Sequence, residues 1–563
     1  MASEKSKSLK NQPTRSESNV SICPAGNRYP LPKEEDYRKE FQRLKKMVEE
    51  QRSLGREIVV VMGVGFVGAV MAGVVADTIN PRNGKPTKFV IAMQRPSTRS
   101  FWKIAYINDG VPPVEAEDPE VAPLIERCVK KKRTLVATYT YEALTLADVV
   151  IVDVQCDYHK MALGRVEDGY ADIKALEESL KVIGEKIQPE CLVLIETTVP
   201  PGTTEYIAYP IMKRAFEKRG FTNIEPLLAH SFERVMPGRE YVASIRDFWR
   251  VCSGINPTAK ERVVRFLSEV INVKKYPLTV LDRPIESETC KIVENSYRAS
   301  ILAFLHEWSV FSERNGVDLI KVLSAIKVRP THSNIIFPGP GIGGYCLPKD
   351  GGLGVWAYRT LMGFEDEIFK ITPLAININD TRAFHAVEIV RDALRNMGKI
   401  VAASKIAVLG ASYREDVGDT RYSGSEIIVR KLTEMGAEIV VHDPYVKHWW
   451  ELEKQDTYPS TGSWARFFRN QEKLKEIQVQ KDLAKTLQGV DAVVLAVRHQ
   501  EYRKLSPAEV VKMVGRPLAV IDCFGILDDA KIRKYFELGC EVKGLGRGHV
   551  KRIKDEVRER RLA

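Results

Sequence analysis

Two stretches of the chain contain short runs made mostly of apolar residues, which alternate with segments whose apolar positions have helical spacing. In the first stretch these runs lie at residues 58–61, 89–93, 148–154 and 191–195. Apolar runs of this length are typical of parallel strands that are buried on both faces. Their alternation with helical segments predicts a doubly wound α/β domain.

The strand pattern restarts in the last third of the chain, after a region of different character. Four further runs lie at residues 405–410, 438–443, 491–497 and 518–522. Between the two stretches, residues 286–315 contain no glycine or proline and repeat apolar residues at helical spacing, which predicts one long helix. The sequence therefore predicts an α/β fold, with two Rossmann-like doubly wound domains joined by a mostly helical middle domain.

The pattern divides the chain into five parts. The Ser/Lys-rich start is expected to be partly disordered, up to about residue 32, and is followed by a charged helix at residues 34–53. The predicted parts are an N-terminal arm (1–56), a first α/β domain (57–256), a helical domain (257–400), a second α/β domain (401–549) and a basic tail (550–563).

A polar stretch at residues 445–481 interrupts the second α/β domain and carries Trp449, Trp450 and Trp464. A lid, a contact surface and an insertion that packs its aromatic side chains locally all fit this composition. Long loops are usually peripheral, so we favour the local insertion.

The composition is that of an ordinary globular protein and says little about partners. The chain is 44% hydrophobic and 28% charged, with a formal net charge of +11 and a pI of about 9.0. This balance suits anionic ligands such as nucleotides, but a generally basic surface is the better explanation of it. We expect the basic chain end to be solvated and not to bind nucleic acid.

Nine cysteines are scattered along the chain without a CxxC pair. This pattern argues against a disulfide framework and a zinc ribbon, and it favours a reducing, cytoplasmic environment with no bound metal. Residues 58–76 are uncharged and long enough to cross a bilayer, but three glycines at fixed spacing interrupt them. A buried strand that turns into a buried helix explains this segment, so we expect no membrane span and no signal peptide.

Gly63, Gly65 and Gly68 follow the first strand and open an apolar helix. In a dinucleotide-binding turn the first glycine permits the tight turn, the second lets the pyrophosphate approach, and the third packs the helix on the strand. The amide groups at the helix start would then face the phosphates. A glycine turn that serves only packing is the alternative, but the position between strand and helix favours cofactor binding.

The second strand ends in Gln94 and Arg95, where NAD-binding enzymes usually carry an acidic residue for the ribose hydroxyls. Gln94 can still bond the ribose, and Arg95 can face a 2′-phosphate or lie over the adenine ring. NAD is therefore the first expectation for the cofactor, and NADP is the alternative.

Cys346 follows a glycine-rich segment, residues 339–344, and precedes a predicted helix start at Pro348. Glycine lets the backbone approach a ligand closely, and a helix N-terminus with Lys349 nearby favours the thiolate form of the cysteine. The other eight cysteines lie in contexts where a small buried side chain is the better interpretation. If the segment is helical, Asp350 shares a helix face with Cys346.

Lys291 and Asn295 lie four residues apart on the long predicted helix. A buried lysine there needs a partner, whereas a lysine on the exposed face of an amphipathic helix needs none, and spacing alone does not decide between them. Glu233 lies in a segment with glycine and proline and is by itself an ordinary salt-bridge candidate.

Together these segments resemble the nucleotide-sugar 6-dehydrogenases of the UDP-glucose/GDP-mannose dehydrogenase family, from about Ile58 to His549. The motifs that carry the resemblance are residues 63–68, 196–204, 231–239, 288–299, 338–350 and 409–425. Segments within them are most similar to the UDP-N-acetylhexosamine branch: residues 197–204, 233–239 and 338–344. The resemblance implies an NAD(P)-binding first domain, a dimer-forming middle domain with the catalytic cysteine, and a UDP-sugar-binding second α/β domain.

The resemblance also implies a four-electron oxidation of a C6 hydroxyl to a uronate. Cys346 would be the nucleophile that forms a thiohemiacetal and then a thioester. Lys291, Asn295 and Asp350 would surround the reacting C6, handling protons and the developing oxyanion. Glu233 would be the base for thioester hydrolysis.

The binding residues are likewise implied by the resemblance. Thr198 would hold the hydrolytic water and the cofactor, and Arg421 would reach the cofactor phosphates. The residues expected to contact the nucleotide sugar are Glu233, Arg234, Lys291, Asn295, Gly343, Tyr413 and Arg414.

Four positions depart from the family's usual pattern. Phe524 stands in place of an arginine, Phe232 in place of a proline, and residues 155–157 in place of a Pro-Thr-Pro turn. Gln94 replaces the acid at the end of the second strand. These changes bear on the identity of the sugar and the cofactor, and they leave the catalytic set intact.

The sequence thus predicts an NAD-dependent dehydrogenase of the UDP-N-acetylhexosamine type that forms a homodimer or higher oligomer, with UDP-glucose or GDP-mannose as alternative substrates. Two other kinds of protein stay open. One is a two-electron dehydrogenase of the hydroxy-acid type. The other is a regulator that binds nucleotide sugars without turnover, and the intact catalytic set argues against it.

Overall fold

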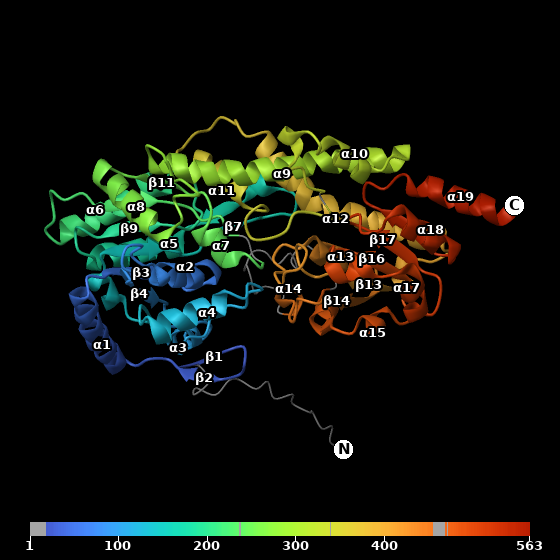
Figure 1. The fold of residues 1–563 in the computed structure, drawn as a ribbon. Coiled ribbons are helices and arrows are strands. Elements are labelled where there is room, and N and C mark those ends of the chain that lie inside the picture. The colour runs from blue at the N-terminus through green and yellow to red at the C-terminus, as the bar shows by residue number, and fades with distance from the viewer. Residues whose placement is uncertain (1–18, 236–237, 338, 454–467, 470) are drawn as a thin grey trace, which may run out of the picture. The chain divides into compact units, whose positions relative to one another are not determined.

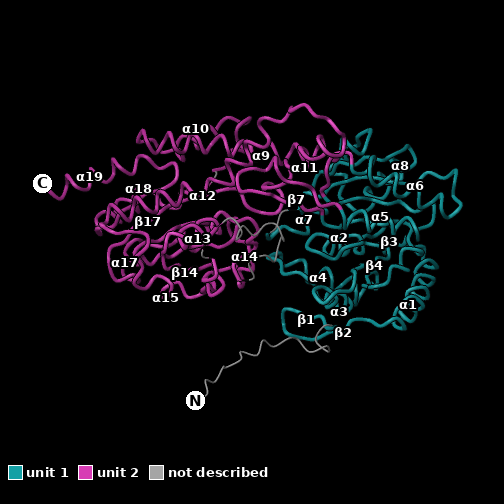
Figure 2. Tube along the Cα trace, turned by 180° about the vertical axis from the view of Figure 1, so that it is seen from behind, with its two compact units in different colours: residues 1–155, 174–197, 203–287 teal, residues 156–173, 198–202, 288–563 magenta. Residues whose placement is uncertain are grey.

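The computed structural model of the chain describes residues 19–235, 238–337, 339–453, 468–469 and 471–563 (Figure 1). Two compact units make up the chain (Figure 2). The first contains residues 1–155, 174–197 and 203–287, and the second contains residues 156–173, 198–202 and 288–563. Each unit is built on its own large sheet.

The first unit contains an eight-stranded sheet in the order β12-β11-β10-β9-β6-β3-β4-β5. Its strands are β3 (Glu57–Met62), β4 (Lys88–Met93), β5 (Leu135–Thr138), β6 (Val149–Val152), β9 (Leu192–Ile195), β10 (Leu227–His230), β11 (Val251–Gly254) and β12 (Thr279–Val280). Strands β3, β4, β5, β6, β9 and β10 pair in parallel, and β11 pairs antiparallel to β10. All four runs expected in this part of the chain are strands.

Helices cover this sheet because its strands are apolar on both faces. Val59 and Val61 of β3 share one core cluster with Val70 and Val74 of α2, the helix that follows the strand directly. The helices of the unit are α2 (Phe66–Asp77), α3 (Trp102–Asn108), α4 (Val121–Glu126), α5 (Lys174–Lys186), α6 (Tyr209–Lys218), α7 (Tyr241–Arg246) and α8 (Pro257–Val270).

The N-terminal arm is more ordered than the sequence suggested. Helix α1 (Glu34–Ser53) has the predicted bounds, but two short strands precede it, β1 (Val20–Ile22) and β2 (Arg28–Pro30), and they pair antiparallel. The expectation of disorder was therefore wrong for residues 19–32, and residues 1–18 lie outside the described part. The polar composition of this segment predicted disorder because it does not reveal the contacts with α3 that stabilise the hairpin. Ser21 is fully buried, and its hydroxyl accepts a hydrogen bond from the backbone amide of Trp102.

The second unit contains a six-stranded parallel sheet in the order β15-β14-β13-β16-β17-β18. Its strands are β13 (Lys405–Leu409), β14 (Glu438–His442), β15 (Val479–Gln480), β16 (Ala492–Leu495), β17 (Ala519–Asp522) and β18 (Glu541–Gly544), with a separate antiparallel pair, β7 (Asp157–His159) and β8 (Tyr170–Asp172). The four runs expected here are strands as well, so the two-sheet α/β prediction is confirmed.

Long helices fill the region before this sheet. The predicted long helix is α9 (Pro284–Asn315), and α12 (Ile371–Asn396) leads into β13. The others are α10 (Leu319–Ile326), α11 (Asp350–Trp356), α13 (Gly424–Glu434), α14 (Trp450–Glu453), α15 (Leu483–Leu487), α16 (Gln500–Lys504), α17 (Pro507–Val514), α18 (Asp529–Glu537) and α19 (Val550–Leu562). The division into three domains stays a prediction.

The tryptophan-bearing segment and the basic chain end both contribute side chains to the core of the second unit. Trp449 is fully buried in the core of the second unit, Trp450 is exposed, and Trp464 lies outside the described residues. The basic chain end forms α19, which buries Ile553 and Val557 in a core cluster with residues of α18. Within the described ranges, we find no helix with the length and apolar character that a membrane crossing requires.

Candidate active site

The glycine turn between β3 and α2 has the shape that a dinucleotide needs. Gly63 has φ +105°, and a Cβ placed there would lie 2.4 Å from the carbonyl oxygen of Asp153. A Cβ on Gly68 would lie 1.9 Å from the carbonyl oxygen of Gly63, so this glycine packs the helix against the strand. A Cβ on Gly65 would meet no atom within 4 Å. Open space over the second glycine fits a pyrophosphate at the start of α2.

The end of β4 provides the next part of this site. The backbone amide of Val64, in the glycine turn, donates to Oε1 of Gln94 at 3.1 Å. The other side of the same amide group, Nε2 of Gln94, lies 3.4 Å from the hydroxyl of Ser100. Gln94 therefore occupies the place expected for the acid, and its side chain is tied to the turn. The side chain of Arg95 points to solvent, 3.9 Å from Glu178.

A cluster of three acidic side chains, of which Glu196 is fully buried, adjoins the sheet of the first unit. Burial, followed by the nearby charges of Glu196 and Glu233, raises the pKa of Asp153, which directly follows β6. Arg250 pairs with Glu196 at 2.5 Å and supplies the cation of the cluster. Glu233 also accepts a hydrogen bond from the backbone amide of Val235. Glu233 thus lies near the carboxylates of Asp153 and Glu196.

Arg234, the neighbour of Glu233, has a different environment. Its Nη1 donates to the carbonyl oxygen of Trp249 at 2.7 Å, and its guanidinium lies 5.1 Å from the ring centre of Phe232. Phe232, one of the departures from the family pattern, therefore contacts the arginine directly. Since a proline offers no such aromatic face, this departure changes how Arg234 is held.

Cys346 lies in a tight turn of the second unit that opens α11. The backbone amides of Lys349 and Asp350 both donate to the carbonyl oxygen of Cys346, at 3.1 and 3.0 Å. The side chain of Cys346 is partly exposed, whereas burial raises the pKa of Cys156 to about 12 and that of Cys252 to about 11. Accessibility therefore separates Cys346 from these buried cysteines.

Asp350 lies at the centre of a buried polar network. Its Oδ2 accepts from the side-chain amide of Asn295 at 2.7 Å, and its Oδ1 accepts from Nζ of Lys349 at 2.7 Å. Lys291, one helical turn before Asn295 on α9, is 7% exposed. Burial opposes the charge of Lys349, but Asp350 and Cys346 outweigh it and raise the pKa of this lysine. The network keeps one positive charge beside the cysteine.

The loop that carries Cys346 packs against the segment that follows β13. A Cβ on Gly343 would lie 2.3 Å from Cβ of Tyr413, and Gly344, at φ +84°, lies against the ring of the same tyrosine. The amide of Gly344 donates to the carbonyl oxygen of Arg421 at 2.8 Å. Burial raises the pKa of Tyr413 to about 12, and the charge of Cys346 contributes to the shift. Only glycine fits at these two positions.

Tyr345 connects this loop to the altered turn at residues 155–157. Its hydroxyl donates to the carbonyl oxygen of Cys156 at 3.2 Å and contacts the carboxylate of Asp157. The ammonium of Lys349 lies 4.4 Å from the ring centre of Tyr345, and the guanidinium of Arg421 lies 5.3 Å from it. Arg421 is also held by Asp419, at 2.8 Å. The departure at residues 155–157 therefore anchors the residue next to the cysteine.

The expected site residues fall into two groups. The second unit brings Cys346, Asp350, Asn295, Gly343, Tyr413 and Arg421 into one contact network, with Lys291 on the same helix as Asn295. Thr198 lies in a segment of this unit whose Gly202 donates a backbone hydrogen bond to Glu288 of α9 at 2.6 Å. The first unit carries the glycine turn, Gln94, Arg95, Glu233 and Arg234.

Sequence reasoning gave little weight to several residues of the site. Lys349 pairs with Asp350 as well as lying near the cysteine, and two adjacent opposite charges at an expected helix start are a sequence signal for such a pair. Asp153 ends an apolar strand, which is also visible in the sequence. Tyr345 has no such signal, because its partners Cys156 and Asp157 lie far along the chain.

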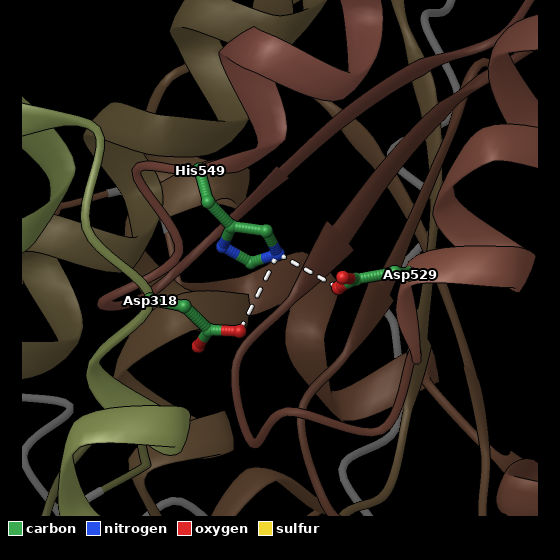
Figure 3. Close-up of side chains that lie close together, drawn as sticks. All are labelled: Asp318, Asp529 and His549. Atoms are coloured by element: carbon green, nitrogen blue, oxygen red, sulfur yellow. Dashed lines mark hydrogen bonds and ion pairs between the residues drawn. The ribbon is translucent and has the colours of Figure 1, made fainter.

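One group of side chains has the geometry of a metal site among the described residues (Figure 3). Nε2 of His549 lies 3.5 Å from Asp318 and 3.2 Å from Asp529. Lys321 lies 2.6 Å from Asp529, and Arg547 lies 3.7 Å from Asp318. Because these cations already neutralise both carboxylates, we interpret the group as an ion-pair network that joins the starts of α10, α18 and α19.

The fold and site define a class of protein, an α/β oxidoreductase with a dinucleotide turn and an accessible cysteine. The family models for UDP-glucose/GDP-mannose dehydrogenases match in chain order: the NAD binding domain at residues 57–270, the central domain at 285–381 and the UDP binding domain at 407–529. The chain belongs to the UDP-glucose/GDP-mannose dehydrogenase family. It is accordingly an oxidoreductase of the nucleotide-sugar dehydrogenase type, as the resemblance implied.

Several relatives are similar over most of their length. UDP-N-acetyl-D-mannosamine dehydrogenase of Pyrococcus horikoshii is 26% identical over 452 residues, which are 79% of this chain and 92% of that protein. UDP-glucose 6-dehydrogenase of Rickettsia conorii is 25% identical and covers 66% of this chain and 79% of its own length. The crystal structure of NDP-N-acetyl-D-galactosaminuronic acid dehydrogenase from Methanosarcina mazei Go1 superposes with a TM-score of 0.68 at 27% identity, covering 90% of this chain and 98% of that one.

Proposed function

We propose that the protein oxidises the C6 hydroxyl of a UDP-N-acetylhexosamine to the corresponding uronate in a four-electron reaction. The observation that carries the proposal is the accessible Cys346 beside the buried Asp350, Lys349 and Asn295 network. The relatives from P. horikoshii and M. mazei, whose names specify N-acetylated sugars, support this substrate class. UDP-glucose is the alternative that the R. conorii relative supports.

The chain's own residues account for the substrate chemistry. When bound, a nicotinamide dinucleotide accepts the hydride that leaves C6. Asp350 takes up the hydroxyl proton as the aldehyde forms, and Lys291 stabilises the charge that develops on the oxygen. The Cys346 thiolate then adds to C6, the C=O π bond opens, and the oxygen takes up a proton to give a thiohemiacetal. Loss of a second hydride leaves a thioester whose carbonyl oxygen is stabilised by Lys291 and Asn295.

Hydrolysis completes the reaction. Glu233 removes a proton from water, which attacks the thioester carbon; the C–S bond breaks and the Cys346 thiolate is restored. One alcohol and one water give one carboxylate and three protons, and two oxidised nicotinamide nucleotides are reduced. Glu233 is assigned this role because it is a carboxylate that lies near Asp153 and Glu196 at the edge of the first unit's sheet, and a carboxylate can serve as a general base.

We also propose that the protein forms a homodimer through α9 and works in the cytoplasm. Exposed apolar side chains follow one face of this helix at intervals of three, four and seven residues: Val293, Tyr297, Phe304, Trp308 and Phe311. A face of this kind is the usual mark of a contact surface. Sedimentation analysis of wild-type protein and a Phe304→Glu, Trp308→Glu variant tests this, and a monomeric wild type contradicts it.

The proposed reaction is tested with a panel of nucleotide sugars and both nicotinamide nucleotides. UDP-N-acetylglucosamine, UDP-N-acetylmannosamine, UDP-N-acetylgalactosamine, UDP-glucose and GDP-mannose are compared by product mass and by the amount of nucleotide reduced. The proposal requires an acid product and two reduced nucleotides for each acid. A ratio of one with an aldehyde or ketone product indicates a two-electron dehydrogenase, and binding without turnover indicates a regulator.

A further inference from the structure

The adenosine end of the cofactor site has an unusual set of side chains. An acid at the end of the second strand would accept hydrogen bonds from both ribose hydroxyls and would repel a phosphate on the 2′ oxygen. Here the residue is Gln94, an uncharged amide whose Oε1 is already engaged by the backbone amide of Val64. The position therefore no longer excludes a 2′-phosphate.

Lys103 places a cation at the same turn. Its Nζ donates to the carbonyl oxygen of Val64 at 3.4 Å and lies 5.9 Å from the ring centre of Trp102. Burial lowers the pKa of Lys103, and within the described residues no carboxylate lies at salt-bridge distance from it. A desolvated ammonium without a carboxylate is unfavourable, so an anionic ligand at this position would relieve the cost.

Two serine hydroxyl groups lie close together in the segment between Gln94 and Lys103. The oxygens of Ser97 and Ser100 are 2.7 Å apart, and Ser100 also donates to the carbonyl oxygen of Arg95 at 3.2 Å. Hydroxyl groups can rotate to donate to a phosphate oxygen. Arg95 pairs with Glu178 only at 3.9 Å, with side chains 71% and 68% exposed, and such a pair contributes little. Its guanidinium can therefore turn to a ligand at small cost.

The N-terminal arm keeps this segment in position. The backbone amide of Trp102 donates to the buried hydroxyl of Ser21 at 3.2 Å, and the indole NH of Trp102 donates to the carbonyl oxygen of Arg99 at 3.0 Å. The family match begins only at residue 57, so the hairpin that contains Ser21 is an addition to the matched domains. Lys103 thus lies on a helix, α3, whose first residue is held in place by hydrogen bonds to Ser21 and Arg99.

We propose that the first unit selects NADP, and that Lys103, Ser97, Ser100 and Arg95 form a site for the 2′-phosphate of its adenosine. The inference rests on the proposed function only in requiring a nicotinamide dinucleotide at the glycine turn. Lys103 supplies a fixed charge, the serines supply donors, and Arg95 closes over the phosphate from solvent. Gln94 matters because it carries no negative charge.

The test measures binding directly, without any sugar. Isothermal titration compares adenosine 2′,5′-bisphosphate with adenosine 5′-monophosphate on the full-length protein. We expect the bisphosphate to bind at least about tenfold more tightly. Equal or weaker binding of the bisphosphate overturns the proposal, whether or not the protein oxidises a nucleotide sugar. Conversely, a strong preference for the bisphosphate in a protein that turns over no nucleotide sugar contradicts the proposed reaction but supports the 2′-phosphate site.

Variants of Lys103 and Gln94 test whether these residues cause the preference for the bisphosphate. Lys103→Met should remove most of the preference while leaving the affinity for the monophosphate within about twofold, and Gln94→Glu should reverse the preference. Lys131→Met, a change at an exposed lysine of the same unit, is the matched control and should behave as wild type. Circular dichroism establishes that each variant is folded. Equal loss of both ligands in Lys103→Met, or an unchanged preference in Gln94→Glu, contradicts the assignment.

Discussion

Asn295 and Asp350 are joined by a 2.7 Å hydrogen bond between the side-chain amide of one and the carboxylate of the other, and both are buried. The bond connects the long helix α9 with the first turn of α11, four residues after Cys346. Because Lys349 occupies the second carboxylate oxygen, the orientation of Asp350 is fixed from two sides. The cysteine therefore stands beside a carboxylate that is already aligned.

Removing the side-chain amide of Asn295 should disturb the orientation of the Asp350 carboxylate. In Asn295→Ala, Oδ2 of Asp350 loses its partner while staying buried, and the oxyanion loses a donor. We expect kcat to fall by about 10²- to 10³-fold. The free energy of unfolding should fall by about 1–3 kcal/mol. Glu307→Gln, an exposed change on α9, is the control for both measurements. A kcat within threefold of wild type would show that Asn295 has no part in the chemistry.

Cys346 and Glu233 should separate the two halves of the reaction. Cys346→Ser should form no acid, whereas Glu233→Gln should stall after the thioester and accumulate it, because no base activates the water. Intact-protein mass spectrometry during a single turnover should show a covalent substrate adduct on Glu233→Gln and none on Cys346→Ser. Cys290→Ser, at a partly buried cysteine of α9, is the control and should turn over normally. Acid formation by Cys346→Ser would refute the covalent route.

A second buried ion pair provides a test of stability. Nζ of Lys160 lies 2.7 Å from both carboxylate oxygens of Asp380, and the two side chains are 0% and 3% exposed. Burial lowers the pKa of Lys160 and raises the pKa of Asp380, so each charge depends on the other. Asp380→Asn should therefore lower the free energy of unfolding by about 3–5 kcal/mol.

Urea denaturation measures this change. A Lys160→Met, Asp380→Leu double variant should recover most of the loss, since no unpaired charge remains buried. Lys475→Met breaks an exposed pair with Glu472 and should change stability by less than about 0.5 kcal/mol. A double variant less stable than Asp380→Asn would mean that the pair itself contributes a net stabilisation.

His306 should make the protein less stable on the acid side of neutrality. Burial, followed by the charges of Arg382 and His385, lowers the pKa of His306 to about 3. An unfolded histidine titrates near 6.5, so between about pH 6.5 and 3 the unfolded state binds the extra proton and stability falls as the pH falls. His306→Gln, which keeps an acceptor for Arg382, should reduce this loss, by less than about 1.4 kcal/mol per pH unit because the ring is partly exposed.

His385 should contribute with the opposite sign. Burial opposes its charge, but the hydrogen bond to Glu313 at 2.6 Å outweighs burial and raises its pKa. The stabilisation that His385 contributes to the folded state is complete below the unfolded pKa of about 6.5, and it is lost as the pH rises through the raised pKa of the folded state. Thermal unfolding at pH 5 and 7 compares wild type with His306→Gln and His385→Gln. The two variants should shift the pH dependence in opposite directions, and shifts of the same sign would contradict this assignment.

The sequence by itself determined the strands of both sheets, the long helix α9 and the glycine turn. Strands such as β3 are continuous apolar runs because both of their faces are buried, and a pattern of this kind is readable within a few residues. The motif at residues 63–68 depends on local backbone geometry, which glycine alone permits. The accessible cysteine was also visible, because its glycine-rich setting differs from that of the other cysteines.

Only the tertiary structure decided which side chains meet. Asp350 and Asn295 are 55 residues apart along the chain, and Ser21 and Trp102 are 81 apart. Contacts over such separations leave no periodic trace in the sequence, so the ordered hairpin before α1 was not predicted. Burial and partner choice follow from how the elements pack, and packing is a property of the folded chain as a whole.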